Sequence, residues 1–331
     1  MRVLIAGSTG AVGSRLVPRL VAAGHQVTGL TRTSAKTAEI ERAGATALVA
    51  DAFDGPLVRQ LVLDVQPEVV VHEMTALANA SDLAHFDRSF AMTNRLRKEG
   101  LDHLLAAARE IGVRRVVAQS FCGWPYARTG GAVKTEEDPL DPNPPREFRN
   151  TLDALRHLEN AVAGAADFEG LVLRYGALYG PCSGLFDGPF VDQLRRRRVP
   201  IIGDGGGWWS FLHLDDASAA TARAVEQGAP GLYNIVDGDP SPVREWLPEL
   251  AAMLGAKPPL RVPRWLARIA AGKHMVALMT ENRAGSNIKA RRELGWSPKY
   301  PSWRTGFAEV IASTNGASEM RWRADIKPHL S

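Results

Sequence analysis

Short apolar runs alternate with longer amphipathic segments through the first half of this 331-residue chain. The runs are nearly continuous in apolar residues, as is typical of strands covered on both faces, and they span 2–7, 26–32, 46–51, 68–74, 114–120 and 169–176. The amphipathic segments have a helical period and span 12–23, 86–112 and 148–164. This alternation predicts an α/β fold with a doubly wound parallel sheet.

The second half of the chain is less regular. Residues 123–145 are rich in Pro, Gly and Asp, and glycines cluster at 184–188 and 203–207, so we expect loops there. Helices are predicted at 214–227, 242–254 and 263–272, and a further strand at 232–237. The predicted domains are a first one over 1–180 to which 208–237 return, a smaller C-terminal lobe mainly over 181–312, and a weakly ordered polar tail over 313–331.

A glycine-rich turn joins the first predicted strand to the first predicted helix. It reads Gly7-Ser8-Thr9-Gly10-Ala11-Val12-Gly13. The first glycine permits a tight turn, the second lets a pyrophosphate approach the backbone, and the third lets the helix pack near the strand. The helix start then offers free N–H groups and a partial positive charge. Between a strand and a helix, this spacing predicts dinucleotide binding.

Residues after the second and third predicted strands bear on the choice of dinucleotide. Arg32 ends the second strand, where a carboxylate would instead grip the ribose hydroxyls of NAD. A guanidinium suits a 2′-phosphate, so NADP is preferred over NAD, although Arg32 stacking on adenine or facing water stays an alternative. Asp51 ends the third strand, where it either accepts from the adenine amino group or caps the following segment.

Composition excludes several classes of protein. The apolar share is 45% and the charged share 23%, which is ordinary for a globular enzyme. The two cysteines, Cys122 and Cys182, do not make a disulfide scaffold, and no apolar stretch approaches a membrane span. We therefore expect a soluble, cytoplasmic protein with no membrane partner.

Charged and metal-binding residues add little to this picture. The net charge is +4 and the basic residues are scattered among acids, so nucleic acid is not an expected partner. The cluster Arg195 to Arg198 is either a solvated helix end or an anchor for an anionic group. The histidines show no metal-ligand spacing, and no GxSxG motif occurs, so neither a metal nor a serine-hydrolase site is predicted.

Several motifs in order along residues 1–312 resemble the extended short-chain dehydrogenases/reductases of the NAD-dependent epimerase/dehydratase family. They are GSTGAVG, Asp51, HEMTA (72–76), the helix near Asn94, LRYGALYGP (173–181), SFLHLDDAS (210–218) and ELGWSPKYPSWRTGF (293–307). The resemblance implies a Rossmann-type domain that holds NAD(P) and a lobe that holds a small-molecule substrate. It places further cofactor contacts at Ala52, Met74, Thr75, Asn94, Gln119, Tyr175 and Gly176.

The catalytic pair of that family is missing from the matching positions. The family uses a Ser or Thr after strand five, then a Tyr with a Lys four residues later, which tunes the tyrosine for proton transfer. Glu159 matches the acid that usually follows, and this register puts Thr151 in place of Tyr and Leu155 in place of Lys. No Tyr-x-x-x-Lys occurs anywhere in the sequence. Ser120 matches the family's Ser/Thr, with a structural strand-end serine as the alternative.

Three hypotheses account for the missing pair. In the first, proton transfer is taken over by Tyr126, in the loop after Ser120, or by Glu73, at the end of the fourth strand. The structural alternative is aromatic packing for Tyr126 and a buried, hydrogen-bonded carboxyl for Glu73. In the second, the substrate needs only hydride placement. In the third, the protein binds the dinucleotide without turnover, as a regulator.

The hypothesis that we favour is an NAD(P)-dependent oxidoreductase acting on a small ring-containing or carbonyl metabolite, with Ser120, Tyr126 and Glu73 as its candidate catalytic residues. A nucleotide-sugar epimerase or dehydratase is the alternative enzyme. Trp124 and residues 208–211 are aromatic, which suits either a ring-bearing substrate or packing between the lobes. Family members commonly dimerise through the helices at 86–112 and 148–164 in this numbering, so a homodimer is an open alternative.

Overall fold

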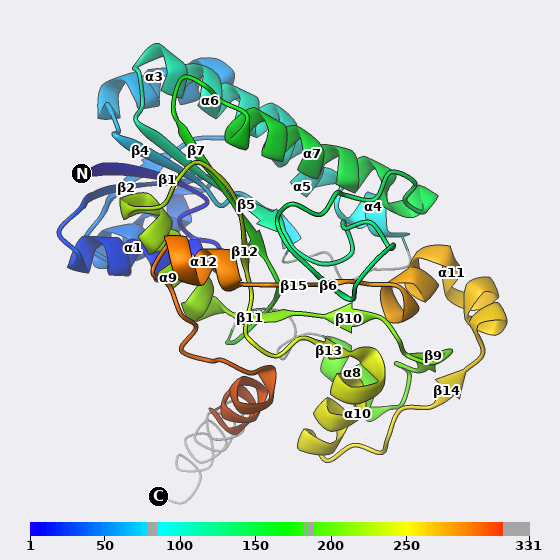
Figure 1. Cartoon of the computed structure of the whole chain (residues 1–331). Helices are drawn as coiled ribbons and strands as arrows, with labels where there is room; N and C mark the ends of the chain where they lie inside the picture. The colour runs from blue at the N-terminus through cyan, green and yellow to red at the C-terminus, as the bar shows by residue number, and fades with distance from the viewer. Residues whose placement is uncertain (78–84, 182, 184–188, 314–331) are drawn as a thin grey trace, which may run out of the picture.

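The computed structural model describes residues 1–77, 85–181, 183 and 189–313. Its centre is a seven-stranded parallel sheet in the order β12-β7-β5-β4-β1-β2-β3 (Figure 1). The strands are β1 (Arg2–Ala6), β2 (Gln26–Thr31), β3 (Thr46–Val49), β4 (Val69–His72), β5 (Arg115–Phe121), β7 (Glu169–Tyr175) and β12 (Gly231–Ile235). The predicted doubly wound α/β fold is therefore confirmed, and β12 comes from the second half of the chain.

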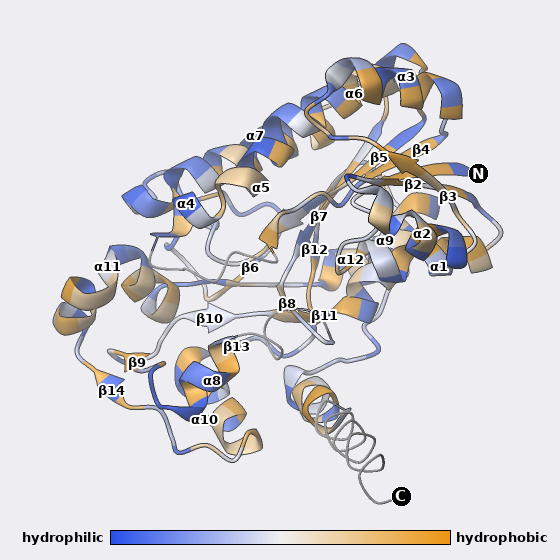
Figure 2. Ribbon diagram, turned by 180° about the vertical axis from the view of Figure 1, so that it is seen from behind, coloured by the Kyte–Doolittle hydropathy of each residue, from blue (hydrophilic) through white to orange (hydrophobic). Residues whose placement is uncertain are grey.

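Both faces of the sheet are buried, which explains why its strands read as continuous apolar runs. In β1, Val3 and Ile5 belong to one core cluster, while Leu4 and Ala6 belong to another on the opposite face. The first cluster packs under α1 (Gly13–Ala22), α2 (Thr37–Arg42), α9 (Leu214–Glu226) and α12 (Ile288–Glu293). The second packs under α3 (Gly55–Val65), α6 (Leu101–Glu110) and α7 (Arg149–Ala163). Figure 2 shows polar residues along the outer sides of these helices.

The helix expected over 86–112 is interrupted. It consists of α4 (Phe86–Ser89), α5 (Ala91–Arg95), a π-helical turn, η4 (Leu96–Gly100), and α6. In that turn the N–H of Leu101 reaches back to the carbonyl of Leu96, which also hydrogen-bonds the His72 ring at 3.3 Å. A buried histidine on the neighbouring strand thus fixes an irregularity that the hydrophobic period does not reveal.

The smaller lobe contains α8 (Pro189–Arg195), α10 (Val243–Met253) and α11 (Arg264–Thr280) around its own core cluster. Short strands pair beside it: β8 (Ala177–Tyr179) with β11 (Phe211–His213), β9 (Ile201–Ile202) with β14 (Arg261–Val262), β10 (Trp208–Trp209) with β13 (Ser241–Pro242), and β6 (Val133–Lys134) with β15 (Ala284–Gly285). The helix predicted to stop at 272 continues to 280, because Gly272 (φ 86°) kinks it rather than ending it.

Two other expectations concern the ends and charges of the chain. The tail predicted over 313–331 lies, except for its first residue, outside the described residues, as does Cys182. The basic cluster Arg195 to Arg198 begins at the last residue of α8, and Arg197 Nε donates to the Pro258 carbonyl at 3.0 Å. Cations there complement the negative end of a helix. Within the described part of the chain, no helix is long and apolar enough to cross a bilayer.

Candidate active site

The glycine-rich turn lies where the direction of strand order reverses, because β1 has β2 on one side and β4 on the other. Gly7 (φ 94°) sits against β4, and a Cβ there would come within 2.6 Å of the Glu73 backbone. A Cβ on Gly13 would be 2.2 Å from the Gly7 carbonyl oxygen. A Cβ on Gly10 would meet only that oxygen, at 3.2 Å, among the described residues. The turn therefore excludes a side chain at Gly7 and Gly13 and is less crowded at Gly10.

The start of α1 is left free for an anion. No side chain caps it, and its first turn contains no acidic residue. Ser8 is buried and its hydroxyl donates to the Leu30 carbonyl at 2.8 Å, so this side chain braces the turn against β2. An uncapped helix end beside an open glycine fits a pyrophosphate, and Gly7, Ser8, Thr9, Gly10, Ala11, Val12 and Gly13 would hold it.

Other predicted cofactor residues follow the same edge of the sheet. Arg32 is exposed directly after β2, and Asp51 is exposed after β3, where its carboxylate accepts from the Phe53 N–H at 3.0 Å. Ala52, Met74 and Thr75 are half-buried. These positions leave Arg32 and Asp51 accessible to a ribose and an adenine.

The remaining predicted cofactor residues are more enclosed. Asn94 is buried and donates from Nδ2 to the Thr151 hydroxyl at 3.0 Å. Gln119 is 9% exposed in β5. A Cβ on Gly176 would come within 2.8 Å of the Ser210 carbonyl oxygen, so this glycine allows a close crossing of two chain segments. Their contacts with a cofactor stay predictions.

Glu73 lies directly behind the glycine turn. Its carboxyl is 4% exposed and accepts a hydrogen bond from the Tyr175 hydroxyl at 2.7 Å. Its second oxygen has no partner among the described residues. Burial raises the pKa of Glu73 to about 8, because the interior disfavours the charged carboxylate more than the hydrogen bond from Tyr175 favours it. A neutral carboxyl behind the turn avoids repelling an anionic phosphate in front of it.

Ser120 and Tyr126 are held in a buried network rather than in an open cleft. Ser120 Oγ donates to Glu159 Oε1 at 2.7 Å, and Arg174 forms two hydrogen bonds with the same carboxylate at 2.8 and 2.6 Å. Arg174 also donates to the Tyr126 hydroxyl at 3.0 Å, which in turn donates to Asn234 at 2.6 Å. Burial raises the pKa of Tyr126 well above its usual range. The catalytic roles predicted for Ser120, Tyr126 and Glu73 stay predictions.

The positions that the resemblance assigns to the Tyr-Lys pair, Thr151 and Leu155, are buried residues of α7. Thr151 is fully buried, and its hydroxyl donates to Asp87 Oδ1 at 2.6 Å. Leu155 is 1% exposed and packs in the interior. Neither side chain offers a group that transfers a proton near neutral pH. No cluster of three metal-binding side chains occurs among the residues that the structure describes.

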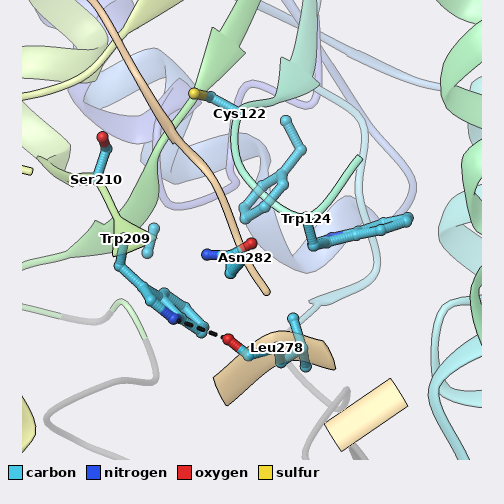
Figure 3. Close-up of a pocket in the computed structure, with 8 residues that line it drawn as sticks. Cys122, Trp124, Trp209, Ser210, Leu278 and Asn282 are labelled. Atoms are coloured by element: carbon cyan, nitrogen blue, oxygen red, sulfur yellow. Dashed lines mark hydrogen bonds between the residues drawn. The ribbon is translucent and has the colours of Figure 1, made fainter. Parts of the chain in front are cut away.

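A pocket opens between the carboxyl edge of the sheet and the smaller lobe (Figure 3). We call it the aromatic pocket; it is a narrow space with a volume of about 10 Å³, lined by Phe121, Cys122, Trp124, Ala177, Trp209, Ser210, Leu278 and Asn282. The rings of Phe121 and Trp124 are 6.5 Å apart between centroids. None of the lining side chains is charged.

A second pocket shares part of this wall. It is lined by Trp124, Leu278 and Asn282 from the aromatic pocket, together with Arg128, Asp141, Pro145, Phe148, Ala277 and Glu281. Arg128 is paired there with Asp141 at 3.0 Å and with Glu281 at 2.8 Å. Sequence reasoning singled out only Trp124 and the 208–211 segment. It missed Cys122, Leu278 and Asn282, because chain segments far apart in sequence meet here.

Known proteins resemble this chain over most of its length. It is 43% identical over 309 residues to the 3-diazoavenalumate denitrifying reductase of a Streptomyces species, covering 93% of this chain and 99% of that protein. It is 27% identical to the 2-alkyl-3-oxoalkanoate reductase of Stenotrophomonas maltophilia, covering 77% and 76%. The solved UDP-glucose 4-epimerase of Thermotoga maritima, with UDP-glucose, has a TM-score of 0.73 at 22% identity and covers 96% and 99%, which shows the shared fold.

The fold, the glycine turn and these relatives together define an oxidoreductase that uses a nicotinamide cofactor. The sequence model of the NAD-dependent epimerase/dehydratase family matches residues 3–236. The chain belongs to this family, as its motifs predicted, and it is an enzyme of the extended short-chain dehydrogenase/reductase type.

Proposed function

We propose that this protein is a reductase that places a hydride on a strongly electron-poor, ring-bearing substrate, and that a diazo group on an aromatic ring is the favoured target. The aromatic pocket carries this proposal, because it offers three aromatic rings and no charged side chain. Such a wall suits a planar ring but provides no general acid. The 43% identical relative, named for the denitrifying reduction of 3-diazoavenalumate, supports the diazo group as target.

The chemistry of a diazo target explains how the enzyme works without a Tyr-Lys pair. When bound, a reduced nicotinamide supplies a hydride. In an arenediazonium ion the C–N bond breaks, its electron pair leaves with dinitrogen, and the hydride pair forms the new C–H bond. Atoms and electrons balance with NADPH as the two-electron donor, and no proton is consumed. Thr151 and Leu155 in place of the catalytic pair are then compatible with turnover.

The pocket wall is also suited to an electrophile. Cys122 is 2% exposed, and burial raises the pKa of its thiol to about 12. The thiolate is the nucleophilic form of cysteine, so this thiol stays inert beside a diazonium group. The hydroxyl of Tyr126 is turned into the network with Asn234 and Arg174. A reactive substrate therefore meets neither an ionised thiol at Cys122 nor a free phenol at Tyr126.

The test measures both the oxidation of NADPH and the origin of the hydrogen atom in the product. The protein is mixed with NADPH and, separately, with a benzenediazonium salt, an aryl ketone, an enone, a quinone and UDP-glucose, and NADPH oxidation is recorded. With NADPH deuterated at the transferred position, we expect arene carrying deuterium and release of dinitrogen. In D₂O with ordinary NADPH, we expect no deuterium in the arene.

The Gly10→Ala variant is the control for uncatalysed reduction of the diazonium salt by NADPH. Gly10→Ala places a methyl group 3.2 Å from the Gly7 carbonyl oxygen, where a pyrophosphate must approach, so we expect this variant to fold and to lose cofactor-dependent turnover. Deuterium from D₂O in the product would show that a proton donor takes part, contrary to the proposal. If the enzyme reduces a ketone or converts UDP-glucose but does not reduce the diazonium salt, the diazo group is not its target.

The choice of NADP over NAD is part of the same proposal. It is supported by exposed Arg32 directly after β2, with exposed Lys36 at the end of the next short helix, η1 (Ser34–Lys36). Arg32→Ala should weaken NADPH binding about tenfold and leave NADH binding nearly unchanged, because only NADPH carries a 2′-phosphate. Arg42→Ala, an exposed arginine on α2, is the control. Equal loss for both cofactors would contradict a phosphate-binding role.

The oligomeric state and location are also proposed rather than observed. A homodimer through α6 and α7 is supported by their position side by side on the outer face (Figure 1), where His157 Nε2 bonds Asp102 at 2.7 Å. Light scattering should then give twice the 35.8 kDa of one chain. A cytoplasmic location is supported by the need for a nicotinamide cofactor.

A further inference from the structure

A group of large apolar side chains is exposed on the first part of α11, before the kink at Gly272. Trp265 is 66% exposed, Leu266 43% and Ile269 77%, and Leu260, just before the helix, is 49% exposed. We call these four residues the apolar patch. α11 lies at the outer edge of the smaller lobe, away from the central sheet (Figure 1). Exposed apolar side chains that gather in one place with polar residues around them mark a binding surface.

Helical spacing puts the apolar patch on the side of α11 that faces solvent. Ala267 is 5% exposed and packs into the core of the smaller lobe, so this side of the helix faces inward. Trp265 and Ile269 are four positions apart and lie one above the other on the outer side. Arg264 and Arg268 have the same spacing and form a row of cations along one border of the patch. This part of α11 is therefore amphipathic, with its apolar side turned outward.

The charge along this segment is entirely positive. Residues 250–280 contain no Asp or Glu and five exposed cations, Lys257, Arg261, Arg264, Arg268 and Lys273. Among the described residues, Arg264 is the one of these five with an ion pair, to Asp204 at 3.1 Å, and both of these side chains are more than half exposed. Such an exposed pair is weak in water. The charges beside the patch are therefore left to attract a partner.

The basic cluster Arg195 to Arg198 adds to this charge. Arg197 Nε donates to the Pro258 carbonyl at 3.0 Å, so the cluster lies against the chain just before Leu260. A surface of this charge attracts an anionic partner. It does not suit a second copy of this chain bound through the same face, because a two-fold axis would set these cations opposite one another.

We propose that the apolar patch and the cations around it bind the surface of a membrane that carries anionic lipids. Trp and aliphatic side chains on one side of a helix, with Lys and Arg beside them, are typical of helices that lie in a lipid interface. The apolar side chains enter the boundary between headgroups and acyl chains, and the cations contact lipid phosphates. This binding needs no helix that crosses the bilayer. It departs from the absence of a membrane partner expected from the sequence, and it does not rest on the proposed function.

Co-sedimentation of the full chain with vesicles tests this binding. We expect the protein to bind vesicles of phosphatidylcholine with phosphatidylserine, to bind phosphatidylcholine alone much more weakly, and to leave the anionic vesicles as salt is raised. Trp265→Gln and Ile269→Gln should each weaken binding about tenfold, because each removes an apolar side chain from the interface. Arg268→Gln should weaken binding about fivefold and make it less sensitive to salt.

Ile288→Gln is the matched control for the apolar residues. Ile288 is 70% exposed but lies on α12, outside the patch, so this variant should bind vesicles as the wild type does. All of the substituted side chains are exposed, so the variants should melt with the wild type, which circular dichroism checks. Absence of binding to the anionic vesicles, or an equal loss of binding in Ile288→Gln, overturns the proposal. A mass in light scattering that falls from two chains to one in Ile269→Gln also overturns it, because a second copy then covers the patch.

Discussion

At the scale of single residues, the pair Arg174 and Glu159 decides what its neighbours can do. Both side chains are almost fully buried, with 3% and 6% of their surface exposed. Removing one partner of such a pair leaves an uncompensated charge in the interior, so the network that includes Ser120 and Tyr126 is costly to open. Their hydroxyls are therefore committed to holding β5, β7 and α7 together in this structure.

Tyr126→Phe separates a structural hydroxyl from a proton donor. We expect kcat for a diazonium salt to stay within about threefold of wild type, because loss of a general acid would instead cost about 10²–10⁴-fold. Unfolding in urea should show a loss of about 1–3 kcal/mol, because Asn234 loses its hydrogen-bond donor and Arg174 loses an acceptor.

Tyr233→Phe is the matched control for that variant. Tyr233 is also fully buried, and its hydroxyl donates to the Ala229 carbonyl at 2.7 Å. It should lose stability without any change in kcat. A fall in kcat confined to Tyr126→Phe would restore the predicted role of Tyr126 as proton donor.

Glu73 gives a prediction about pH. Its folded pKa, raised to about 8 by burial, lies above the ordinary value of 4.5, so the folded state keeps a proton that the unfolded state has lost. The stability associated with this group is complete below pH 4.5 and is lost as pH rises toward 8. The free energy of unfolding of wild type relative to Glu73→Gln should therefore fall by about 1.4 kcal/mol per pH unit in this range.

The window from pH 6.5 to 8 isolates Glu73. His72, its neighbour in sequence, has its pKa lowered to about 4 by burial, but it is present in both proteins, so its contribution cancels in the difference between them. Urea unfolding of both proteins at several pH values across this window checks the prediction. If the difference in free energy of unfolding between wild type and Glu73→Gln does not change with pH, Glu73 is already ionised in the folded protein.

At the same scale, sequence reasoning found the residues that act through local backbone geometry. The glycines at 7, 10 and 13 are recognisable because one strand, one turn and one helix are consecutive in the chain. Asn282 and Cys122 are about 160 positions apart and carry no local signature, yet both line one pocket. Such a site depends on tertiary packing, which the pattern along the chain does not contain.

At the scale of elements, α11 shows how one residue determines the shape of a helix. Gly272 has φ 86° and ψ 169°, a conformation essentially restricted to glycine. The segment after this kink carries Ala277 and Leu278, which line the two pockets. The kink therefore links the exposed first part of α11 to a wall of the candidate active site.

Gly272→Ala should destabilise the protein by about 1–3 kcal/mol, because the added methyl group forces this backbone conformation on a residue that disfavours it. Its Cβ would also lie 3.0 Å from the ring of His274. Urea unfolding gives the value, and Gly131→Ala, where φ is not positive and the nearest atom lies 3.8 Å away, should change it by less than about 0.5 kcal/mol. Equal stability of the two variants would contradict the need for glycine at 272.

The same element explains which helices and strands could be predicted. Strands buried on both faces give a strong signal, and all seven strands of the sheet were expected from apolar runs. The helix predicted over 263–272 is too short, because tertiary contacts continue α11 to Thr280. The two-residue strands β9, β10, β13 and β14 have no period to detect, because each depends on a partner distant in sequence.

At the scale of the whole molecule, the sheet brings the two halves of the chain to one edge. The glycine turn, Arg32 and Asp51 come from the first half, and Ala177, Trp209 and Asn282 come from the second. A dinucleotide bound along this edge binds the folded protein and not the unfolded chain, because only folding brings these residues together. Its binding free energy therefore adds to the stability of the folded state.

NADPH at about one hundred times its dissociation constant should add about 2.7 kcal/mol to the free energy of unfolding and raise the melting temperature by about 5 °C. Gly10→Ala tests whether this stabilisation comes through the glycine turn. The apo variant should keep the fold, because its methyl group would meet only the Gly7 carbonyl oxygen among the described residues, at 3.2 Å, yet it should show no shift with NADPH. Thermal unfolding followed by circular dichroism measures both shifts without any turnover. A full shift in the variant would place the dinucleotide elsewhere on the molecule, whatever substrate the enzyme reduces.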